Sequence, residues 1–497
     1  MPLAMPAPEP EILARREELL TRLRKILPAQ NVIADETARR AYECDAFTMY
    51  RALPLVVALP ETVPQVQAIM ALAQEMNVKI VPRGGGTSLS GGSMPLEDGI
   101  LLGMSKFNRI LEIDFENRCA RVQPGVQNLA ISRAVEHGGF YYAPDPSSQI
   151  ACSIGGNVAE NAGGVHCLKY GLTTNNILGL EVVLMGGEII RLGGKHLDSE
   201  HYDLIGLMTG SEGLLGVVTE VTVRILQKPT VARGLLLGFS SVEAGARCVG
   251  AIIARGIIPG GMEMMDKATI HAVERFQPCG YPLDAAAIVI VELDGTPAEV
   301  DHLVGVVEEI ARAEGATTTK ASNSEAERLQ FWAGRKNAFP AVSCIGPDYL
   351  CMDGTIPRGR LPEVLKGMDE LAKKHGLRVA NVFHAGDGNL HPLILYDASI
   401  DGDIERAENL GADILRLCVA VGGVLTGEHG VGVEKRDLMG EMFNEVDLAQ
   451  QMRVKCAFDP AGRLNPGKVF PTLHRCAELG AMHVVGGAVP FPDLPRF

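Results

Sequence analysis

The sequence predicts an α+β protein with two principal domains, and three observations lead to this expectation. At 497 residues the chain is too long for one hydrophobic core. Apolar runs of strand length alternate with stretches whose apolar residues recur at helical spacing. The polar segment Q-K-P-T then separates two such alternations. We expect an N-terminal helical segment, a first domain, a second domain and a C-terminal segment, over residues 1–50, 51–228, 229–425 and 426–497.

The first domain is predicted from a β-α-β beginning followed by further strands. Mixed charges and apolar spacing predict an amphipathic helix within residues 8–30. Val, Ile and Leu at helical spacing predict a second helix over 61–76. Strands are predicted where short apolar runs end in Gly, Pro or polar residues, over 54–60, 78–83, 99–104, 110–114, 120–126, 179–185, 188–192 and 216–226.

The second domain repeats the alternation of strands and helices. Strands are predicted over 234–239, 286–294, 378–384 and 390–396. Helices are predicted from Val242 onward and over 298–314, 361–376 and 403–421. The last two strands are joined by A-G-D-G-N, which favours a hairpin turn. Residues 435–475 predict a helical tail that closes with F-D-P-A-G-R-L-N-P-G-K.

Charge and hydropathy exclude several classes of protein. The formal net charge is −14 and no basic stripe occurs in the sequence, so nucleic acid is not expected as a partner. The sequence contains no run of about 18 apolar residues, so no membrane-spanning helix is predicted. The N-terminal residues do not resemble a secretory signal. We expect a cytoplasmic protein with at most a peripheral contact to the inner face of the cytoplasmic membrane.

The cysteines favour a reducing compartment. Eleven cysteines occur without any C-x-x-C pair, which is typical of reduced, mostly buried thiols. The usual ferredoxin spacing for an iron–sulfur cluster is absent from the sequence. An electron-transfer role for this protein would therefore need a redox centre other than such a cluster.

Glycines gather in four segments, at 84–92, 155–164, 206–216 and 422–432. The first, V-P-R-G-G-G-T-S-L-S-G-G, follows a predicted strand, and its backbone N–H groups could form an anion nest suited to a diphosphate. It matches neither the dinucleotide fingerprint G-x-G-x-x-G nor a P-loop. Taken alone, this loop is as consistent with a structural turn as with a ligand site.

The next two glycine segments favour a ligand. P-D-P-S-S-Q-I-A-C-S-I-G-G-N-V-A-E-N-A-G-G places two glycine pairs eight residues apart, and we expect no helix to cross it. L-M-T-G-S-E-G-L-L-G-V-V-T-E-V is a turn leading into a strand. Three separate structural turns are the alternative, but one large cofactor lying along all three segments explains them together.

Two histidines flank the predicted hairpin turn in V-F-H-A-G-D-G-N-L-H-P-L. His384 and His391 would lie near each other across the two strands, and G-E-H-G follows with Glu428. Two imidazoles and a carboxylate suit a divalent metal with open coordination positions. From the residues alone, a metal site and satisfied core histidines are equal alternatives.

These motifs carry a family resemblance. R-G-G-G-T-S-L-S-G-G, S-I-G-G-N-V-A-E-N-A-G-G and T-G-S-E-G-L-L-G-V-V-T-E resemble the FAD-binding domain of the vanillyl-alcohol oxidase/PCMH flavoprotein family. H-A-G-D-G-N-L-H and G-E-H-G are similar to its FAD-linked D-2-hydroxyacid dehydrogenase branch. The resemblance implies a two-subdomain PCMH-type FAD-binding domain at 51–228 and an α+β cap (substrate) domain at 229–425. Residues 426–497 would complete the active site and return to the FAD domain.

The resemblance also implies which residues hold FAD. The loop Gly84, Gly85, Gly86, Thr87 and Ser88 would bind the diphosphate. The rest of the cofactor would be lined by Pro144, Ser148, Gly155, Gly156, Asn157, Gly163, Gly164, Gly210, Glu212, Val218 and Asn465. Family members with covalent flavin often carry a histidine in the first loop. None is present here, so noncovalent FAD is expected.

For the chemistry, the resemblance implies that His384, His391 and Glu428 bind one divalent metal, with zinc as first choice and Mn²⁺ or Fe²⁺ as alternatives. His429 would be the base that accepts the hydroxyl proton; orienting a metal ligand is its alternative role. Arg335 would bind the substrate carboxylate through paired hydrogen bonds. Its neighbour Lys336 is expected to face elsewhere, Trp332 to be core or pocket wall, and Asp387 to be structural.

The expected activity is oxidation of a small (R)-2-hydroxy acid, glycolate first and D-lactate second, to glyoxylate or pyruvate. Electrons would pass to a second FAD-binding-like subunit and an iron–sulfur subunit, and then to quinone rather than NAD. The nearest alternative is a D-lactate or D-2-hydroxyglutarate dehydrogenase that works without partner subunits. An alternative of another class is a non-catalytic metal-binding subunit.

Overall fold

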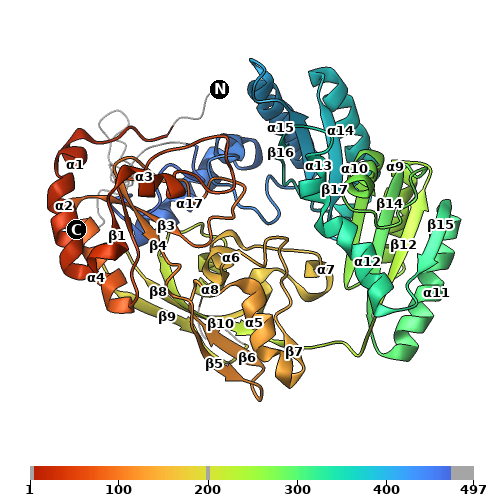
Figure 1. The fold of residues 1–497 in the computed structure, drawn as a ribbon, viewed down its shortest axis with the longest axis horizontal. Coiled ribbons are helices and arrows are strands. Elements are labelled where there is room, and N and C mark those ends of the chain that lie inside the picture. The colour runs from red at the N-terminus through yellow and green to blue at the C-terminus, as the bar shows by residue number, and fades with distance from the viewer. Residues whose placement is uncertain (1–4, 198–201, 472–497) are drawn as a thin grey trace, which may run out of the picture.

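The computed structural model describes residues 5–197 and 202–471 (Figure 1). The end of the predicted helical tail, 472–475, lies outside them. The first domain begins with a four-stranded sheet in the order β1-β2-β4-β3, in which β2 and β3 run parallel to β4 and β1 runs antiparallel to β2. These strands are β1 (Val32–Ile33), β2 (Val56–Ala58), β3 (Lys79–Arg83) and β4 (Gly99–Gly103).

Helices cover this sheet through one apolar core. The helix α4 (Val63–Met76) connects β2 to β3, and its Ile69 and Met70 pack in the same core as Leu20 and Leu23. The single helix predicted within residues 8–30 is instead two, α1 (Pro10–Ala14) and α2 (Arg16–Ile26). They are divided at Arg15, whose backbone leaves the helical conformation.

A second, antiparallel sheet completes the first domain, in the order β5-β6-β10-β8-β9. Its strands lie where the sequence predicts them: β5 (Ile110–Asp114), β6 (Cys119–Val122), β8 (Ile177–Val183), β9 (Ile189–Gly193) and β10 (Val217–Arg224). Its core also includes residues of α5 (Asn128–Val135) and α6 (Ile154–Glu160).

The helix α6 corrects one expectation, because it crosses the 144–164 glycine segment after all. Ser153 caps its N-terminus by accepting the Gly156 N–H, and Gly155 and Gly156 fall in its first turn. Backbone N–H groups there have no partner within the helix, so glycine is tolerated at little cost. Asn161 then ends the helix in the left-handed conformation, with φ of 54°.

The second domain is a seven-stranded antiparallel sheet with helices on both faces (Figure 1). Its order is β15-β12-β14-β13-β17-β18-β16. The strands are β12 (Val231–Phe239), β13 (Gly261–Asp266), β14 (Ala287–Gly295), β15 (Ala316–Ala321), β16 (Asp348–Cys351), β17 (Arg378–Phe383) and β18 (Pro392–Tyr396). The predicted strands at 234–239, 286–294, 378–384 and 390–396 are confirmed.

Alternation along β12 explains the two faces. Leu235 and Leu237 pack in a core with one set of helices, while Leu236 packs on the opposite side. The first set is α9 (Val242–Ala254), α11 (Pro297–Ala313), α14 (Leu361–His375) and α15 (Asp403–Ala420). The second is α10 (Lys267–Phe276), α12 (Glu325–Lys336) and α13 (Ala338–Val342).

The C-terminal segment returns to the first domain. It contains η6 (Arg436–Leu438), α16 (Met439–Met442) and α17 (Glu445–Phe458), and α17 lies beside β3 and β4 in Figure 1. The buried Lys455 ammonium donates to the carbonyl of Leu214 at 2.7 Å and pairs with Asp459 at 2.5 Å. Leu464 forms a parallel bridge with Ile80 of β3.

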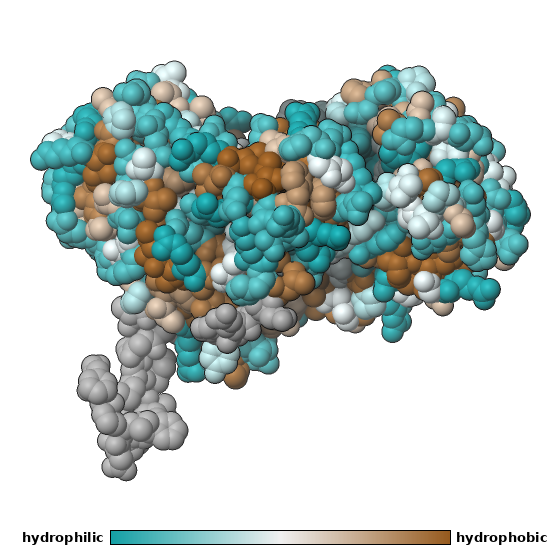
Figure 2. Space-filling model, turned by 90° about the horizontal axis from the view of Figure 1, so that it is seen from below, coloured by the Kyte–Doolittle hydropathy of each residue, from teal (hydrophilic) through white to brown (hydrophobic). Residues whose placement is uncertain are grey.

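The remaining elements are short connections: η1 (Ala29–Asn31), α3 (Glu36–Arg39), η2 (Arg40–Tyr42), η3 (Glu136–Gly138), β7 (Phe140–Tyr141), α7 (Cys167–Tyr170), η4 (Thr173–Asn176), α8 (Leu204–Met208), β11 (Leu226–Gln227) and η5 (Arg358–Arg360). Within residues 5–197 and 202–471, no helix has the length and apolarity needed to cross a membrane. On the face shown in Figure 2, hydrophobic residues form separate patches among hydrophilic ones.

Nine described cysteines are free thiols, but Cys456 is disulfide-bonded, so the expectation of reduced thiols is wrong there.

Candidate active site

One cavity of about 520 Å³ brings the glycine segments and the histidine motifs to a common space. Its wall contains backbone from all three glycine segments of the first domain, together with His391, Glu428 and His429. Cavities of about 300–1,000 Å³ are typical of ligand and cofactor sites. The glycine segments predicted to bind a cofactor and the residues predicted to be catalytic or metal-binding therefore line the same cavity.

Most of the residues expected to bind FAD line this cavity: Gly84, Gly85, Gly86, Thr87, Ser88, Ser148, Gly155, Gly156, Asn157, Glu212 and Val218. The others are not part of its wall: Pro144, Gly163, Gly164, Gly210 and Asn465. Asn465 lies behind the wall and supports it, because its side-chain amide donates to the carbonyls of Gly92 and Glu212 at 3.0 and 2.7 Å.

Close backbone packing explains the glycines of the first loop. A side chain at Gly84 would collide with the Ser153 hydroxyl, and one at Gly85 would come within 2.9 Å of the Ala151 carbonyl. The Ser153 hydroxyl accepts the Gly85 N–H at 3.1 Å and also caps α6. The loop and the start of α6 thus pack closely against each other at one part of the wall, and the N–H groups of Gly85, Gly155 and Gly156 already have acceptors within the protein.

The β17–β18 hairpin brings the two predicted metal ligands together. Asn381 pairs with Pro392 across the ladder, and His384 forms a bridge with Asn389 beyond it. The rings of His384 and His391 lie 5.1 Å apart, which confirms that they face each other across the turn. Gly388, with φ of 84°, supplies the left-handed residue of the turn.

Glu428 meets both imidazoles. Its Oε1 lies 3.2 Å from His384 Nε2 and 3.0 Å from His391 Nε2. Ligand atoms about 2.0–2.2 Å from a tetrahedral zinc lie roughly 3.3 Å from one another, so these separations suit a shared metal. Gly163 leaves the room for Glu428, because a side chain at that position would come within 2.6 Å of its Oε2.

The outward-facing ring nitrogens support the same interpretation. His384 Nδ1 lies 2.6 Å from Glu263 Oε1, and His391 Nδ1 lies 3.3 Å from the Met352 carbonyl. Such partners hold the proton on Nδ1 and leave Nε2 free, as is usual for metal-binding histidines. The residues present therefore fit a divalent metal at His384, His391 and Glu428.

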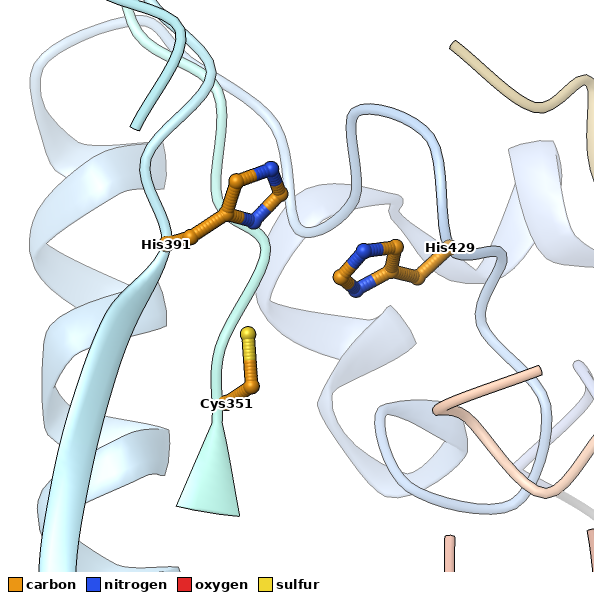
Figure 3. A group of neighbouring side chains, drawn as sticks. All are labelled: Cys351, His391 and His429. Atoms are coloured by element: carbon orange, nitrogen blue, oxygen red, sulfur yellow. The ribbon is translucent and has the colours of Figure 1, made fainter. Parts of the chain in front are cut away.

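A second group of side chains shares His391 and also contains Cys351 and His429. Figure 3 shows these three side chains converging from separate segments. The two imidazoles are stacked, with ring centroids 4.9 Å apart and planes 15° from parallel, so they present faces rather than nitrogen lone pairs to one another. Burial raises the pKa of the Cys351 thiol well above its usual range, which makes it a poor ligand. This group fits a metal less well than the first.

His429 is partly buried, with 16% of its side chain exposed, and it has a free ring nitrogen. Its Nδ1 has no hydrogen-bond partner in the described residues, and its Nε2 lies 3.7 Å from Glu428 Oε1. Burial lowers the pKa of His429 to about 4, so the imidazole is neutral at pH 7. A neutral imidazole beside the proposed metal ligands can accept a proton.

Arg335 and Lys336 take different directions, but it is Lys336 and not Arg335 that lines the cavity, which corrects the expectation that Lys336 faces elsewhere. Arg335 is 2% exposed, and its Nε donates to Glu263 Oε2 at 2.5 Å. Its Nη2 has no partner among residues 5–197 and 202–471 and can still bind an anion. Lys336 is exposed and lines the cavity, whereas Arg335 is not part of its wall.

Trp332 and Asp387 have structural contacts. Trp332 is buried in the cap core, and its indole N–H donates to Glu292 at 2.5 Å. Asp387 accepts the Asn389 N–H at 3.0 Å within the hairpin turn.

Buried carboxylates from both domains fix the loop that carries Glu428 and His429. Asp353, which follows β16, accepts the N–H groups of Gly427 and His429 at 3.1 and 2.9 Å. Glu212, from the third glycine segment, accepts those of Val431 and Gly432 at 2.6 and 2.7 Å. We call residues 427–432 the bridging loop, because its two ends are held by different domains.

Sequence reasoning missed the positioning roles of Glu263 and Asp353. The available signal was a charged residue within an apolar strand, as in G-G-M-E-M-M-D, and another in C-M-D-G. Both carboxylates are buried, with at most 1% of each residue exposed. Buried charges need partners, so such positions point to a network even before its members are known.

Comparisons with known proteins agree with this geometry. Residues 54–193 match the FAD binding domain family and residues 228–469 match the family described as FAD linked oxidases, C-terminal domain. The glycolate oxidase subunit GlcD of Escherichia coli (strain K12) is 57% identical over 97% of both proteins. The D-lactate dehydrogenase of Archaeoglobus fulgidus is 34% identical over 84% of this sequence and 92% of its own.

A solved structure, that of p-cresol methylhydroxylase with substrate bound, superimposes with a TM-score of 0.77 at 18% identity, covering 92% of this protein and 97% of the other. A likeness at this identity concerns the fold. The expected α+β, PCMH-type architecture is confirmed.

Glu263→Gln tests the metal site. Glutamine has no charge and only one acceptor oxygen to share between His384 and Arg335, so the contact that orients His384 weakens and zinc affinity is expected to fall about 10- to 100-fold. Metal titration and FAD content would be measured together, and FAD content is expected to stay unchanged. Glu292→Gln is the matched control, since Glu292 is also buried, lies on the neighbouring strand and pairs with an arginine. Equal zinc affinity in the wild type and in Glu263→Gln would contradict the assignment.

Proposed function

Because the chain belongs to the family of FAD-linked oxidases that includes the glycolate oxidase subunit GlcD, we propose that it oxidises a small (R)-2-hydroxy acid, glycolate first and D-lactate second. The observation that carries the proposal is the cavity, which joins the glycine segments of the FAD-binding domain to His391, Glu428 and His429. The products are glyoxylate and pyruvate.

Three segments predict the D subunit of bacterial glycolate oxidase in particular. They are P-D-P-S-S-Q-I-A-C-S-I-G-G-N, F-W-A-G-R-K-N-A-F-P-A-V and P-D-Y-L-C-M-D-G-T-I-P. The family and the close likeness to a glycolate oxidase subunit confirm this prediction.

The residues divide the chemistry among them. FAD, held by the glycine segments, would supply the acceptor, at its N5, for the hydride that leaves C2 of the acid. Arg335 binds the carboxylate through Nη2 while Glu263 holds its Nε, so the guanidinium is already oriented. His429 accepts the hydroxyl proton, because burial keeps its imidazole neutral.

His384, His391 and Glu428 would hold the metal, which lowers the pKa of an alcohol bound to it. Zinc is the first choice for two imidazoles and a carboxylate, with Mn²⁺ or Fe²⁺ as alternatives. Glu263 and the Met352 carbonyl keep the two Nε2 atoms available for it.

The electrons must leave the reduced cofactor. The relative from Escherichia coli is named as a subunit, and this sequence lacks a cysteine run for an iron–sulfur cluster. We therefore propose transfer to a second FAD-binding-like subunit and an iron–sulfur subunit, with any membrane contact peripheral. Full quinone-linked turnover by the isolated protein would contradict this arrangement.

The substrate is tested by anaerobic mixing with glycolate, D-lactate, L-lactate and D-2-hydroxyglutarate. The flavin absorbance is expected to bleach fastest with glycolate, then with D-lactate, and not with L-lactate. Fastest bleaching with D-2-hydroxyglutarate would favour the alternative dehydrogenase. A colourless protein that binds metal would favour a non-catalytic subunit.

Arg335→Lys tests the carboxylate site while leaving Glu263 a cationic partner. A lysine cannot reproduce the planar guanidinium, so the KM for glycolate is expected to rise about 10- to 100-fold. The flavin should remain bound. Lys336→Gln is the neighbouring control, and its KM is expected to stay within about twofold. A larger effect in the control would transfer the role to Lys336.

His429→Asn distinguishes two roles of His429, that of the catalytic base and that of a residue that only orients a metal ligand. Flavin reduction by glycolate under anaerobic stopped-flow conditions is expected to slow about 10²- to 10⁴-fold at neutral pH. Metal and FAD content should match the wild type. If the variant loses its metal and regains a normal reduction rate when metal is added back, His429 orients a metal ligand and is not the base.

A further inference from the structure

Glu160 lines the active-site cavity, yet the proposed reaction gives it no role. It is the last residue of α6, and its Oε2 is buried without a hydrogen-bond partner in the described residues. An ionised carboxylate oxygen without a donor is expensive to bury. The protonation state of Glu160 therefore depends on the neighbouring charges and on the ligand that occupies the cavity.

The carboxyl of Glu212 lies close by and differs in its contacts. A side chain at Gly92 would come within 2.7 Å of Glu160 Oε1 and 3.6 Å of Glu212 Oε2, so both carboxyls reach the same glycine. Glu212 accepts the N–H groups of Val431 and Gly432. Donors of this kind favour the charged form, and Glu160 Oε2 has none among the residues that the structure describes.

The two carboxyls also differ in pKa. Burial raises the pKa of Glu160 well above its ordinary value, and the nearby charge of Glu212 raises it further. Burial raises the pKa of Glu212 too, but the N–H groups of Val431 and Gly432 oppose this shift. Like charges this close do not both ionise at low cost, and the proton is best held by Glu160, whose Oε2 lacks a donor in the described residues.

Other charged groups around Glu160 have their own contacts. Lys435 donates to the Gly430 carbonyl at 2.9 Å and pairs with Glu434 at 2.9 Å. Lys468 donates to the Met94 carbonyl at 2.8 Å. Burial raises the pKa of Asp45 to about 6, and the charge of this third carboxyl raises the pKa of Glu160 further. Over residues 5–197 and 202–471, neither lysine forms an ion pair with the Glu160 carboxyl.

We propose that Glu160 keeps its carboxyl proton at neutral pH and donates it in a hydrogen bond to the bound flavin cofactor. The inference rests on FAD occupying this cavity, as in the proposed function. A neutral donor can approach the cofactor without opposing the negative charge that reduction brings, whereas a carboxylate would repel it. Glu160 is thus a cofactor-contacting residue that favours the reduced flavin.

Infrared spectroscopy of the holoenzyme tests the proton directly. A protonated-carboxyl C=O band that shifts between oxidised and reduced enzyme is expected at neutral pH, and it should be lost in Glu160→Gln. If the wild type shows no such band, or if the band persists unchanged in Glu160→Gln, the proposal is overturned.

The flavin reduction potential and FAD affinity give a second test in folded protein. Glu160→Gln keeps a neutral donor, so both quantities should stay close to those of the wild type. Glu160→Ala removes the donor, so FAD binding should weaken about 2- to 10-fold and the potential should fall. A raised potential in Glu160→Gln would mean that the wild-type group is a carboxylate, and an unchanged Glu160→Ala would exclude the contact.

The two proposals fail in different ways. A protein that binds no flavin, or whose flavin is not bleached by any 2-hydroxy acid, contradicts the proposed function. Normal bleaching by glycolate, together with no carboxyl band or a raised potential in Glu160→Gln, contradicts only the role of Glu160.

Discussion

The bridging loop at residues 427–432 is the constraint on which the active site depends. Asp353 of the second domain holds its first residues, and Glu212 of the first domain holds its last. Each carboxylate accepts backbone N–H groups, so the loop is fixed whatever side chains it carries. The segment between these two anchors bears Glu428, which meets the hairpin histidines, and His429, which lies against His391. The proposed metal ligands and the cavity are therefore parts of one assembly.

Buried carboxylates do most of this positioning, which is notable in a protein of net charge −14 that is to bind an anionic acid. Glu263 accepts from both His384 and Arg335, and so links the proposed metal to the proposed carboxylate site. In the proposed function Arg335 supplies the positive charge, and the contact with Glu263 directs its remaining Nη2. Orientation of a few groups substitutes here for a broad basic surface.

Much of this arrangement follows from local sequence signals. The turn A-G-D-G-N and its flanking apolar runs predict the hairpin and the proximity of His384 and His391, and both are found. Family resemblance adds His429 and Arg335 as candidates and favours a metal at the hairpin histidines and Glu428, since the residues alone leave core histidines as an equal alternative. The α+β architecture and most strands are likewise predictable from periodicity.

The remaining features depend on contacts that periodicity does not encode. Glu263 meets His384 because β13 pairs with β17, more than a hundred residues later in the sequence. The glycines of α6 looked incompatible with a helix, but their place in the first turn removes the cost. Glu160 is polar within that short helix, and only the approach of Glu212 and the bridging loop reveals its unusual surroundings.

The way the bridging loop is held also affects how the substrate can enter. A cap that swung away like a hinged lid would have to pull Asp353 or Glu212 off backbone groups that have little access to water. Such an opening would carry a high kinetic barrier, so we expect the two domains to stay joined at this loop while small acids enter.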